Sequence, residues 1–225
     1  MTNYFYVSPE QLIKDRAEFA QKGIARGRSI VAAIYDNGVV LVAENPSASL
    51  NKISEVYDRI AFAGVGKYNE FDRLREAGIR WADSTGYTYS REDVDARALA
   101  NYYAQHLGDM FTEGQKPLEV EILVAQLGNK LRPTKLYRVA YEGTISDEPR
   151  FAVLGGDAET IKDRFALSED SLQSLATTLH NASTALSGPD RVIPPEELEV
   201  GILEDRGIRR TFLRLTDEQV KELLS

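Results

Sequence analysis

The chain has 225 residues, of which 43% are hydrophobic and 28% charged, and its formal charge is −8. This composition suits a globular protein with a sizeable core, and the acidic balance argues against a general nucleic-acid binder, because phosphate neutralisation needs clustered Lys and Arg. The sequence has no cysteine and only two histidines, His106 and His180, which excludes disulfides, thiolate catalysis and cysteine-ligated or multi-histidine metal sites. We therefore expect no metal and no cofactor.

Signals for export or membrane insertion are also missing from the sequence. No apolar run approaches the roughly 18 residues that a membrane-spanning helix needs. The N-terminal segment MTNYFYVSPEQ lacks the basic-then-apolar layout of a signal peptide. We expect a cytoplasmic protein with no membrane partner.

The first predicted helix covers residues 9–26. Ser8 is a suitable N-cap, Pro9 favours the first turn, and Gln11 stands at the capping-box position three residues after the cap. The residues with helical spacing that form its apolar stripe are Ile13, Ala17, Ala20 and Ile24.

A β-hairpin is predicted directly after this helix. The β-rich runs Ser29–Tyr35 and Val39–Ala43 flank Asp36-Asn37-Gly38, in which Asn-Gly is a strong hairpin signal. Because the second run is apolar at every position, both faces of its strand should be covered. A third β-rich segment, Arg59–Val65, precedes a long helix that ends near Thr85.

Helices and strands continue to alternate to the C-terminus. The remaining predicted elements are a helix over Arg91–Phe111, strands at Leu118–Leu127, Thr134–Tyr141 and Arg150–Leu154, a helical region up to about Ser187 that is broken near Ser168, strands at Leu198–Glu204 and Arg210–Leu215, and a short helix capped by Thr216. His106 lies at four-residue spacing from Tyr102, which predicts a packed core residue and not a ligand. Gly155-Gly156 matches no phosphate-binding fingerprint and indicates a tight strand-to-helix turn. Gly78, inside the apolar stripe of the long helix, predicts close packing against a neighbour.

This order predicts an α+β fold. Buried strands occur in two blocks, each followed by a pair of helices, which favours two stacked sheets with helices on both outer sides. We expect a four-layer αββα sandwich in a single domain over residues 1–225. Its parts would be an N-terminal tail (1–8), the first helix (9–26) and the sandwich (28–225).

Several longer segments are distinctive. They are SPEQLIKDRAEFAQKGIARGRSIVA, VLVAENPSASLNKISEVYDRIAFAG, KYNEFDRLREAGI, LANYYAQ, FTEGQKPLEVEILVA and LYRVAYEGTISDEPRFAVLGG. Together they resemble the α subunits of actinobacterial proteasomes, in the N-terminal-nucleophile hydrolase superfamily. The resemblance covers about residues 4–215, and it implies the same αββα fold.

The resemblance also implies that the catalytic nucleophile is missing from this chain. In catalytic β subunits of this family, cleavage after a glycine exposes an N-terminal threonine nucleophile, which an acid and a lysine support. Gly27 matches that glycine, Glu44 the acid and Lys52 the lysine, but Arg28 occupies the position of the threonine. A guanidinium cannot act as the nucleophile, and Ser29 comes one place too late. We therefore expect no catalytic residue in this chain.

The resemblance implies a different role for Lys52. In proteasome α subunits the matching lysine lies between neighbouring subunits and binds the C-terminal carboxylate of an activator. A localised ammonium charge is suitable for binding a single carboxylate. The alternative from the sequence alone is a surface lysine paired with a nearby acid such as Glu55.

The N-terminal tail resembles the segment that closes the axial pore of the α ring. The residues expected to form this gate are Thr2, Asn3, Tyr4, Phe5, Tyr6, Val7 and Ser8. The alternative is a chain end without one fixed conformation. The helix Pro9–Arg26 is expected to contact activators and adjacent α subunits, and the alternative for its charged face is plain solvated surface.

The function implied is that of a noncatalytic α subunit of the proteasome core. Seven copies would form each outer ring, template the assembly of β subunits, restrict substrate entry and dock a ring-shaped ATPase through its C-termini. The substrates would include unfolded proteins tagged with prokaryotic ubiquitin-like protein, and peptide hydrolysis would take place on the β subunits. Two alternatives are an independently active N-terminal-nucleophile hydrolase and a ring-forming scaffold unrelated to proteolysis.

Overall fold

Two antiparallel sheets of five strands each form the centre of the computed structural model, which describes residues 8–47, 49–130, 132–165 and 172–225. The first sheet has the order β10-β9-β2-β1-β8 and the second the order β3-β4-β5-β6-β7. The strands of the first sheet are β1 (Ile30–Tyr35), β2 (Gly38–Glu44), β8 (Phe151–Leu154), β9 (Leu198–Glu204) and β10 (Phe212–Arg214). Those of the second are β3 (Ile53–Tyr57), β4 (Ile60–Gly66), β5 (Val120–Gln126), β6 (Lys135–Val139) and β7 (Ile145–Glu148).

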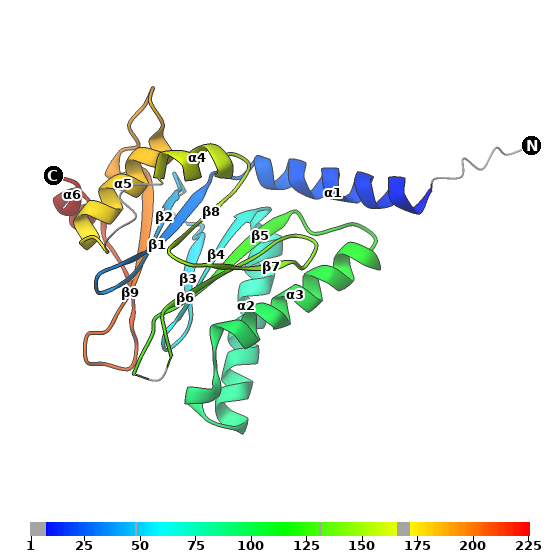
Figure 1. Cartoon of the computed structure of the whole chain (residues 1–225), viewed down its shortest axis with the longest axis horizontal. Helices are drawn as coiled ribbons and strands as arrows, with labels where there is room; N and C mark the ends of the chain where they lie inside the picture. The colour runs from blue at the N-terminus through cyan, green and yellow to red at the C-terminus, as the bar shows by residue number, and fades with distance from the viewer. Residues whose placement is uncertain (1–7, 48, 131, 166–171) are drawn as a thin grey trace, which may run out of the picture.

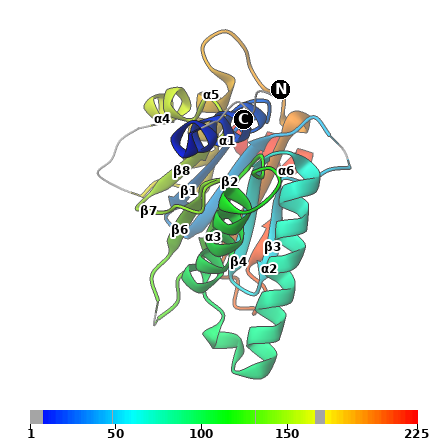
Figure 2. The same ribbon diagram turned by 90° about the vertical axis from the view of Figure 1, so that its right-hand side faces the viewer.

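Helices cover the outer face of each sheet, as Figures 1 and 2 show. The helices on the second sheet are α2 (Tyr68–Thr88) and α3 (Ala96–Thr112), and those on the first are α4 (Ala158–Phe165), α5 (Leu175–Ser187) and α6 (Asp217–Leu224). Two short 3₁₀ helices, η1 (Arg91–Asp93) and η2 (Pro195–Glu197), precede α3 and β9. Three apolar cores fill the spaces between these four layers. The predicted αββα sandwich is confirmed.

The strand β2 confirms the prediction drawn from its continuous apolar run, since all seven of its residues are buried. Leu41 packs in the core between the sheets, while its neighbour Val40 packs towards the helices of the outer layer. Gly38 has a different role from the one predicted. It already pairs with Tyr35 inside the ladder, and a Cβ there would lie 2.0 Å from the carbonyl oxygen of Leu203 on β9. The glycine thus permits close approach of β9.

Two strands, β3 and β7, were not predicted. They are the two edge strands of the second sheet. The residues of β7 are half-buried or exposed, and in β3 the half-buried Ser54 and Glu55 lie between buried residues. Polar residues such as Glu55 and Asp147 interrupt the apolar pattern that identifies a covered strand.

The prediction that His106 packs in the core is wrong, because its side chain is exposed. Helix α3 begins only at Ala96, where the Asp95 side chain caps it by accepting the N–H of Ala98 at 2.8 Å. Steps of four residues drift about 40° per step around a helix of 3.6 residues per turn. The face that is buried therefore mixes steps of three and four, and its residues are Ala96, Leu99, Ala100, Tyr103 and Leu107.

The close packing predicted at Gly78 is confirmed. A Cβ on this residue of α2 would lie 1.7 Å from the hydroxyl oxygen of Tyr103 on α3. The tight turn predicted at Gly155-Gly156 is confirmed as well, since Gly155 has a φ of 116° and α4 begins three residues later.

Helix α1 (Pro9–Ala25) extends away from the sandwich (Figure 1), and only its C-terminal part is buried, at Ala20, Gly23 and Ile24. The predicted apolar stripe therefore does not pack along its whole length, since Ile13 is 57% exposed. Ser8 caps the helix by accepting the N–H of Gln11 at 3.2 Å.

Arg16 fixes α1 to the end of α3. Its guanidinium donates to the carbonyl oxygens of Phe111 at 2.6 Å, Met110 at 3.0 Å and Gly114 at 2.8 Å. These are carbonyls at and just beyond the C-terminal turn of α3, where helices leave acceptors unsatisfied. The direction of α1 is thus set by a polar anchor as well as by its buried end.

Candidate functional site

Glu44 ends β2 and carries a buried carboxylate. Arg191 donates two hydrogen bonds to it, from Nη1 to Oε1 at 2.7 Å and from Nη2 to Oε2 at 2.6 Å. The guanidinium of Arg28, just before β1, pairs with the same Oε1. Two cations thus neutralise the acid. Arg191 was not predicted, because it lies 147 residues away in a segment without a motif.

Lys52 comes directly before β3, and its side chain reaches the same place. Its Nζ donates to the backbone carbonyl oxygens of Arg28 at 2.8 Å and Glu44 at 3.0 Å. The pKa of Lys52 is lowered to about 8, chiefly by burial; the nearby Glu199 carboxylate raises this pKa, and the Arg28 guanidinium adds to the lowering. The structure therefore brings together Arg28, Glu44 and Lys52, as the sequence predicted.

The alternative pairing of Lys52 with Glu55 is not present. Glu55 instead binds Arg210, with its Oε2 accepting from Nε at 2.7 Å and lying 2.6 Å from Nη2. Ser29, the only hydroxyl residue beside the nucleophile position, is 8% exposed. Glu55 is therefore not the partner of the Lys52 ammonium, and the hydroxyl residue Ser29 is buried next to the nucleophile position.

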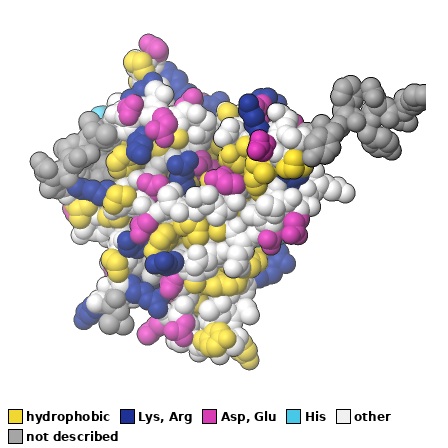
Figure 3. All heavy atoms as spheres, turned by 45° about the vertical axis from the view of Figure 1, so that its right-hand side comes forward, with side chains coloured by type: hydrophobic (Ala, Val, Ile, Leu, Met, Phe, Trp, Pro, Cys, Tyr) yellow, Lys and Arg dark blue, Asp and Glu magenta, His cyan; other side chains and the backbone are white. Residues whose placement is uncertain are grey.

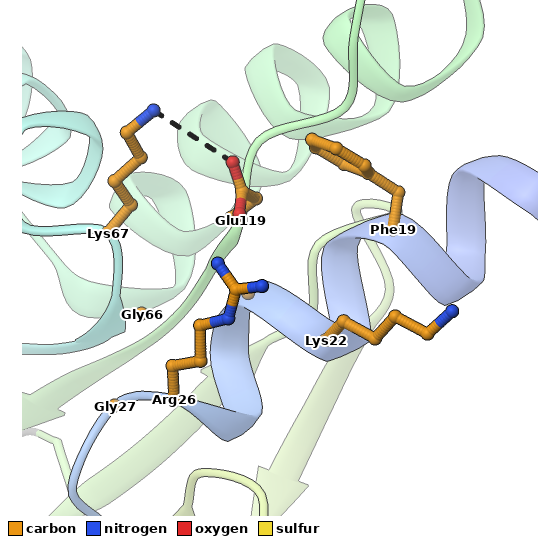
Figure 4. A pocket seen from close by; sticks show the side chains of 8 residues that line it. Phe19, Lys22, Arg26, Gly27, Gly66, Lys67 and Glu119 are labelled. Carbon is orange, nitrogen blue, oxygen red and sulfur yellow. Dashed lines mark ion pairs between the residues drawn. The ribbon is translucent and has the colours of Figure 1, made fainter.

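A cavity of about 480 Å³ opens at the root of α1 (Figure 4). Its lining residues are Phe19, Lys22, Gly23, Arg26, Gly27, Gly66, Lys67 and Glu119. The Nζ of Lys67 lies 3.9 Å from the Oε1 of Glu119, as the dashed line in Figure 4 marks. The cavity and Lys52 are connected along the chain: Gly27 lines the cavity, and the next residue, Arg28, carries the carbonyl that Lys52 binds.

A charged network supports the wall of this cavity. Lys116 donates to Glu70 at 2.6 Å and to Glu119 at 3.2 Å, and Glu70 also accepts the backbone N–H of Glu119 at 2.8 Å. Burial alone would raise the pKa of Glu70, but these hydrogen bonds outweigh it and leave the pKa below its ordinary value. The network fixes Glu119, against which Gly23 of α1 packs without room for a Cβ.

The remaining predicted site residues lie at the N-terminus. Of the gate residues, Thr2 to Val7 lie outside the described residues, and Ser8 is the exposed N-cap of α1. Hydrophobic atoms gather at the projecting end of α1 (Figure 3), where Leu12 and Ile13 are more than half exposed.

Within the described part of the chain, no group of three or more His, Asp or Glu side chains is placed to hold a metal ion. The helices of the same part include none that is both long and apolar enough to cross a membrane.

The fold and the site define an αββα sandwich of the N-terminal-nucleophile hydrolase type in which an arginine stands where the nucleophile would be. Comparisons with known proteins agree: the family described as "Proteasome subunit" matches residues 24–177. The chain belongs to the proteasome subunit family, among its α-type subunits.

Three relatives named "Proteasome subunit alpha" show how far the similarity extends. The relative from Acidimicrobium ferrooxidans is 58% identical over 224 residues, which cover 100% of this chain and 97% of the relative. Those from Sanguibacter keddieii and an Arthrobacter species are 51% and 50% identical, covering all of this chain and 90% and 99% of the relatives. The similarity therefore includes α1 and the C-terminal strands as well as the central sandwich.

Proposed function

We propose that this chain forms the outer, noncatalytic rings of a cytoplasmic proteasome core, where it controls substrate entry and docks an activator. The observation that carries the proposal is Arg28, whose guanidinium fills the nucleophile position and is paired with the acid, Glu44, that would otherwise support catalysis. Peptide hydrolysis then belongs to separate β subunits with an N-terminal threonine. Seven copies would form each ring and template the assembly of those β subunits.

The second part of the proposal concerns activator docking. Lys52 would bind the C-terminal carboxylate of a ring-shaped ATPase, which unfolds proteins tagged with prokaryotic ubiquitin-like protein. The support for this role is that the Lys52 ammonium is bonded to the backbone carbonyls of Arg28 and Glu44 and not to a side-chain carboxylate among the described residues. The neighbouring cavity is lined by the cationic side chains of Lys22, Arg26 and Lys67 and by one carboxylate, that of Glu119. Because the cations outnumber the acid, an anionic chain end would meet a favourable field there.

The N-terminal tail, residues 2–8, would form the gate. Seven aromatic-rich tails that converge on one axis could bury Tyr4, Phe5 and Tyr6 together and obstruct the pore. The support from the described residues is that α1 carries its N-terminal end away from the sandwich, so the tail begins at a projecting point.

The test of the noncatalytic assignment is the intact mass of the chain, combined with peptide hydrolysis. We expect a chain that begins at Met1 or Thr2, has no activity alone, and supports hydrolysis when assembled with a threonine-nucleophile partner. A mature chain that begins at Ser29 and hydrolyses peptides alone would instead establish the independently active hydrolase. Failure to copurify with any such partner would favour a scaffold unrelated to proteolysis.

A further inference from the structure

Glu199 on β9 holds the backbone at the start of β3. Its Oε2 accepts the N–H of Lys52 at 2.8 Å and the side-chain amide of Asn45 at 2.7 Å. Its Oε1 accepts the N–H of Ile53 at 3.0 Å and a guanidinium N–H of Arg214. Two donors meet each oxygen, which matches the acceptor capacity of an ionised carboxylate. The side chain is only 7% exposed, so water cannot easily replace these bonds.

This arrangement joins the two sheets at the residue whose side chain would dock the activator. Glu199 belongs to the first sheet, whereas the backbone carbonyl of Lys52 accepts the N–H of Gly64 on β4 in the second, at 3.0 Å. The backbone of Lys52 is thus held on both sides. The fixed backbone therefore places the Lys52 side chain where its ammonium group donates to the carbonyls of Arg28 and Glu44.

We propose that Glu199 is a positioning residue for activator docking, because it fixes the backbone from which the Lys52 side chain extends and brings a buried negative charge close to that residue. The inference rests on the docking role proposed for Lys52. Glu199 itself does not contact the activator. No motif marks it in the sequence, since the residues that it organises lie about 150 positions away.

The charges around Lys52 favour this role. Among the described residues, Glu199 is the carboxylate that raises the pKa of Lys52, against the opposite effects of burial and of Arg28. The carboxylate of Glu44 is already bound by Arg28 and Arg191, while Arg214 takes up part of the charge of Glu199. Since the ammonium form persists below the pKa of about 8, docking should be present at neutral pH and should fall as the pH rises through about 8.

The decisive variant is Glu199→Gln. A carboxamide has one acceptor oxygen, so its NH₂ group would face two of the four donors, and the negative charge would be lost. We expect the midpoint of docking to move down by about one pH unit, which weakens binding by up to about tenfold at alkaline pH. The probe is a fluorescent peptide with the last ten residues of the ring-shaped ATPase from the same organism, measured by anisotropy on the assembled core particle from pH 6 to 9.5.

Glu121→Gln is the matched control. Glu121 is also buried, pairs with Arg138 and accepts a backbone N–H, that of Gly155 at 3.0 Å, but it lies on β5 and does not contact Lys52. The loss of the Glu121 charge should reduce stability to a similar degree as in Glu199→Gln, but it should leave the docking midpoint near pH 8. The peptide with a C-terminal amide should not bind to any of these particles.

Glu199→Asp separates position from charge. It keeps the negative charge but retracts the carboxylate, so we expect weaker docking at every pH with the midpoint preserved. If Glu199→Gln does not assemble, this variant carries the test, and docking with the affinity of the unaltered particle would overturn the inference. For an assembled Glu199→Gln particle, an unchanged midpoint would overturn it.

A second measurement keeps this inference distinct from the docking proposal. Competitive acetylation with acetic anhydride, followed by peptide mass spectrometry, reports the titration of Lys52 without any activator. A downward shift for Glu199→Gln, combined with peptide binding that survives Lys52→Ala, would support the link between Glu199 and Lys52 while refuting the docking role. No shift in this titration would refute the link itself.

Discussion

At the scale of single residues, one replacement changes the chemistry of the whole site. A guanidinium at position 28 cannot attack a peptide bond, and it also adds a second cation to Glu44, whose side chain is 5% exposed. A buried carboxylate without a partner would be costly, whereas one paired on both sides contributes to a unique arrangement of the segments around it. The acid therefore acts as a structural connection between the root of α1, the end of β2 and the segment that carries Arg191.

Lys52 is the residue with the sharpest functional consequence. We expect Lys52→Ala to leave assembly intact and to abolish stimulation of peptide hydrolysis by an activator with a free C-terminal carboxylate. The variant leaves no carboxylate without a bonded cation, because the Lys52 ammonium is bonded, among the described residues, to the carbonyls of Arg28 and Glu44. The loss of stability should therefore be about 1 kcal/mol. Lys221→Ala on the exposed face of α6 is the control. Stimulation that survives in Lys52→Ala would contradict the docking role.

At the scale of elements, α1 and the tail before it account for the gating part of the proposal. Deletion of residues 2–8 should raise peptide hydrolysis by the assembled particle, because the obstruction at the pore is removed while the active sites are untouched. The measurement is hydrolysis of a short fluorogenic peptide without activator. An equal rate before and after the deletion would show that the tail does not restrict entry.

The contact between α2 and α3 allows a test of packing. In Gly78→Ala the new methyl group would overlap the hydroxyl of Tyr103, and overpacking of this kind costs about 1–3 kcal/mol. Gly108→Ala on α3 is the matched control, since the nearest atom to its Cβ would lie 3.6 Å away and alanine is the better helix former by about 1 kcal/mol. Thermal unfolding should show a lower melting temperature for the first variant and an equal or higher one for the second. The same melting temperature for both would contradict this account.

Elements with local signals could be predicted from the sequence, and those determined by distant contacts could not. The capping box of α6, for example, is present in both halves, between Thr216 and Gln219. The edge strands β3 and β7 were missed because polar residues such as Glu55 and Asp147 interrupt their apolar pattern. In the site, the resemblance identified Glu44 and Lys52, but Arg191 and Glu199 approach them only after folding.

At the scale of the whole molecule, the projecting helix α1 determines how copies can meet. It leaves Leu12 and Ile13 more than half exposed, away from the sandwich that could cover them. A surface on one side of a subunit that fits a different surface on the next gives a head-to-tail contact, and such contacts close into a ring when the rotation between copies closes. We therefore expect these apolar side chains to contact a neighbouring copy.

Native mass spectrometry of the chain expressed with its β partner tests this assembly. We expect particles whose mass corresponds to multiples of seven copies of each subunit. Replacing both Leu12 and Ile13 by Ser should reduce the yield of complete particles, while the isolated chain keeps its fold because neither side chain is buried. Full assembly of that double variant would show that this face of α1 is not an interface.

The anchoring of α1 also has a mechanical consequence. The helix has 17 residues; Arg16 anchors its middle and the buried residues Ala20, Gly23 and Ile24 hold its C-terminal part. Only the segment before Arg16, about 10 Å long, stands free. A tilt of about 10° at this anchor would move the tip of α1 by about 2 Å, so a ligand that shifts the anchor would move the point where the tail begins without breaking any strand or helix.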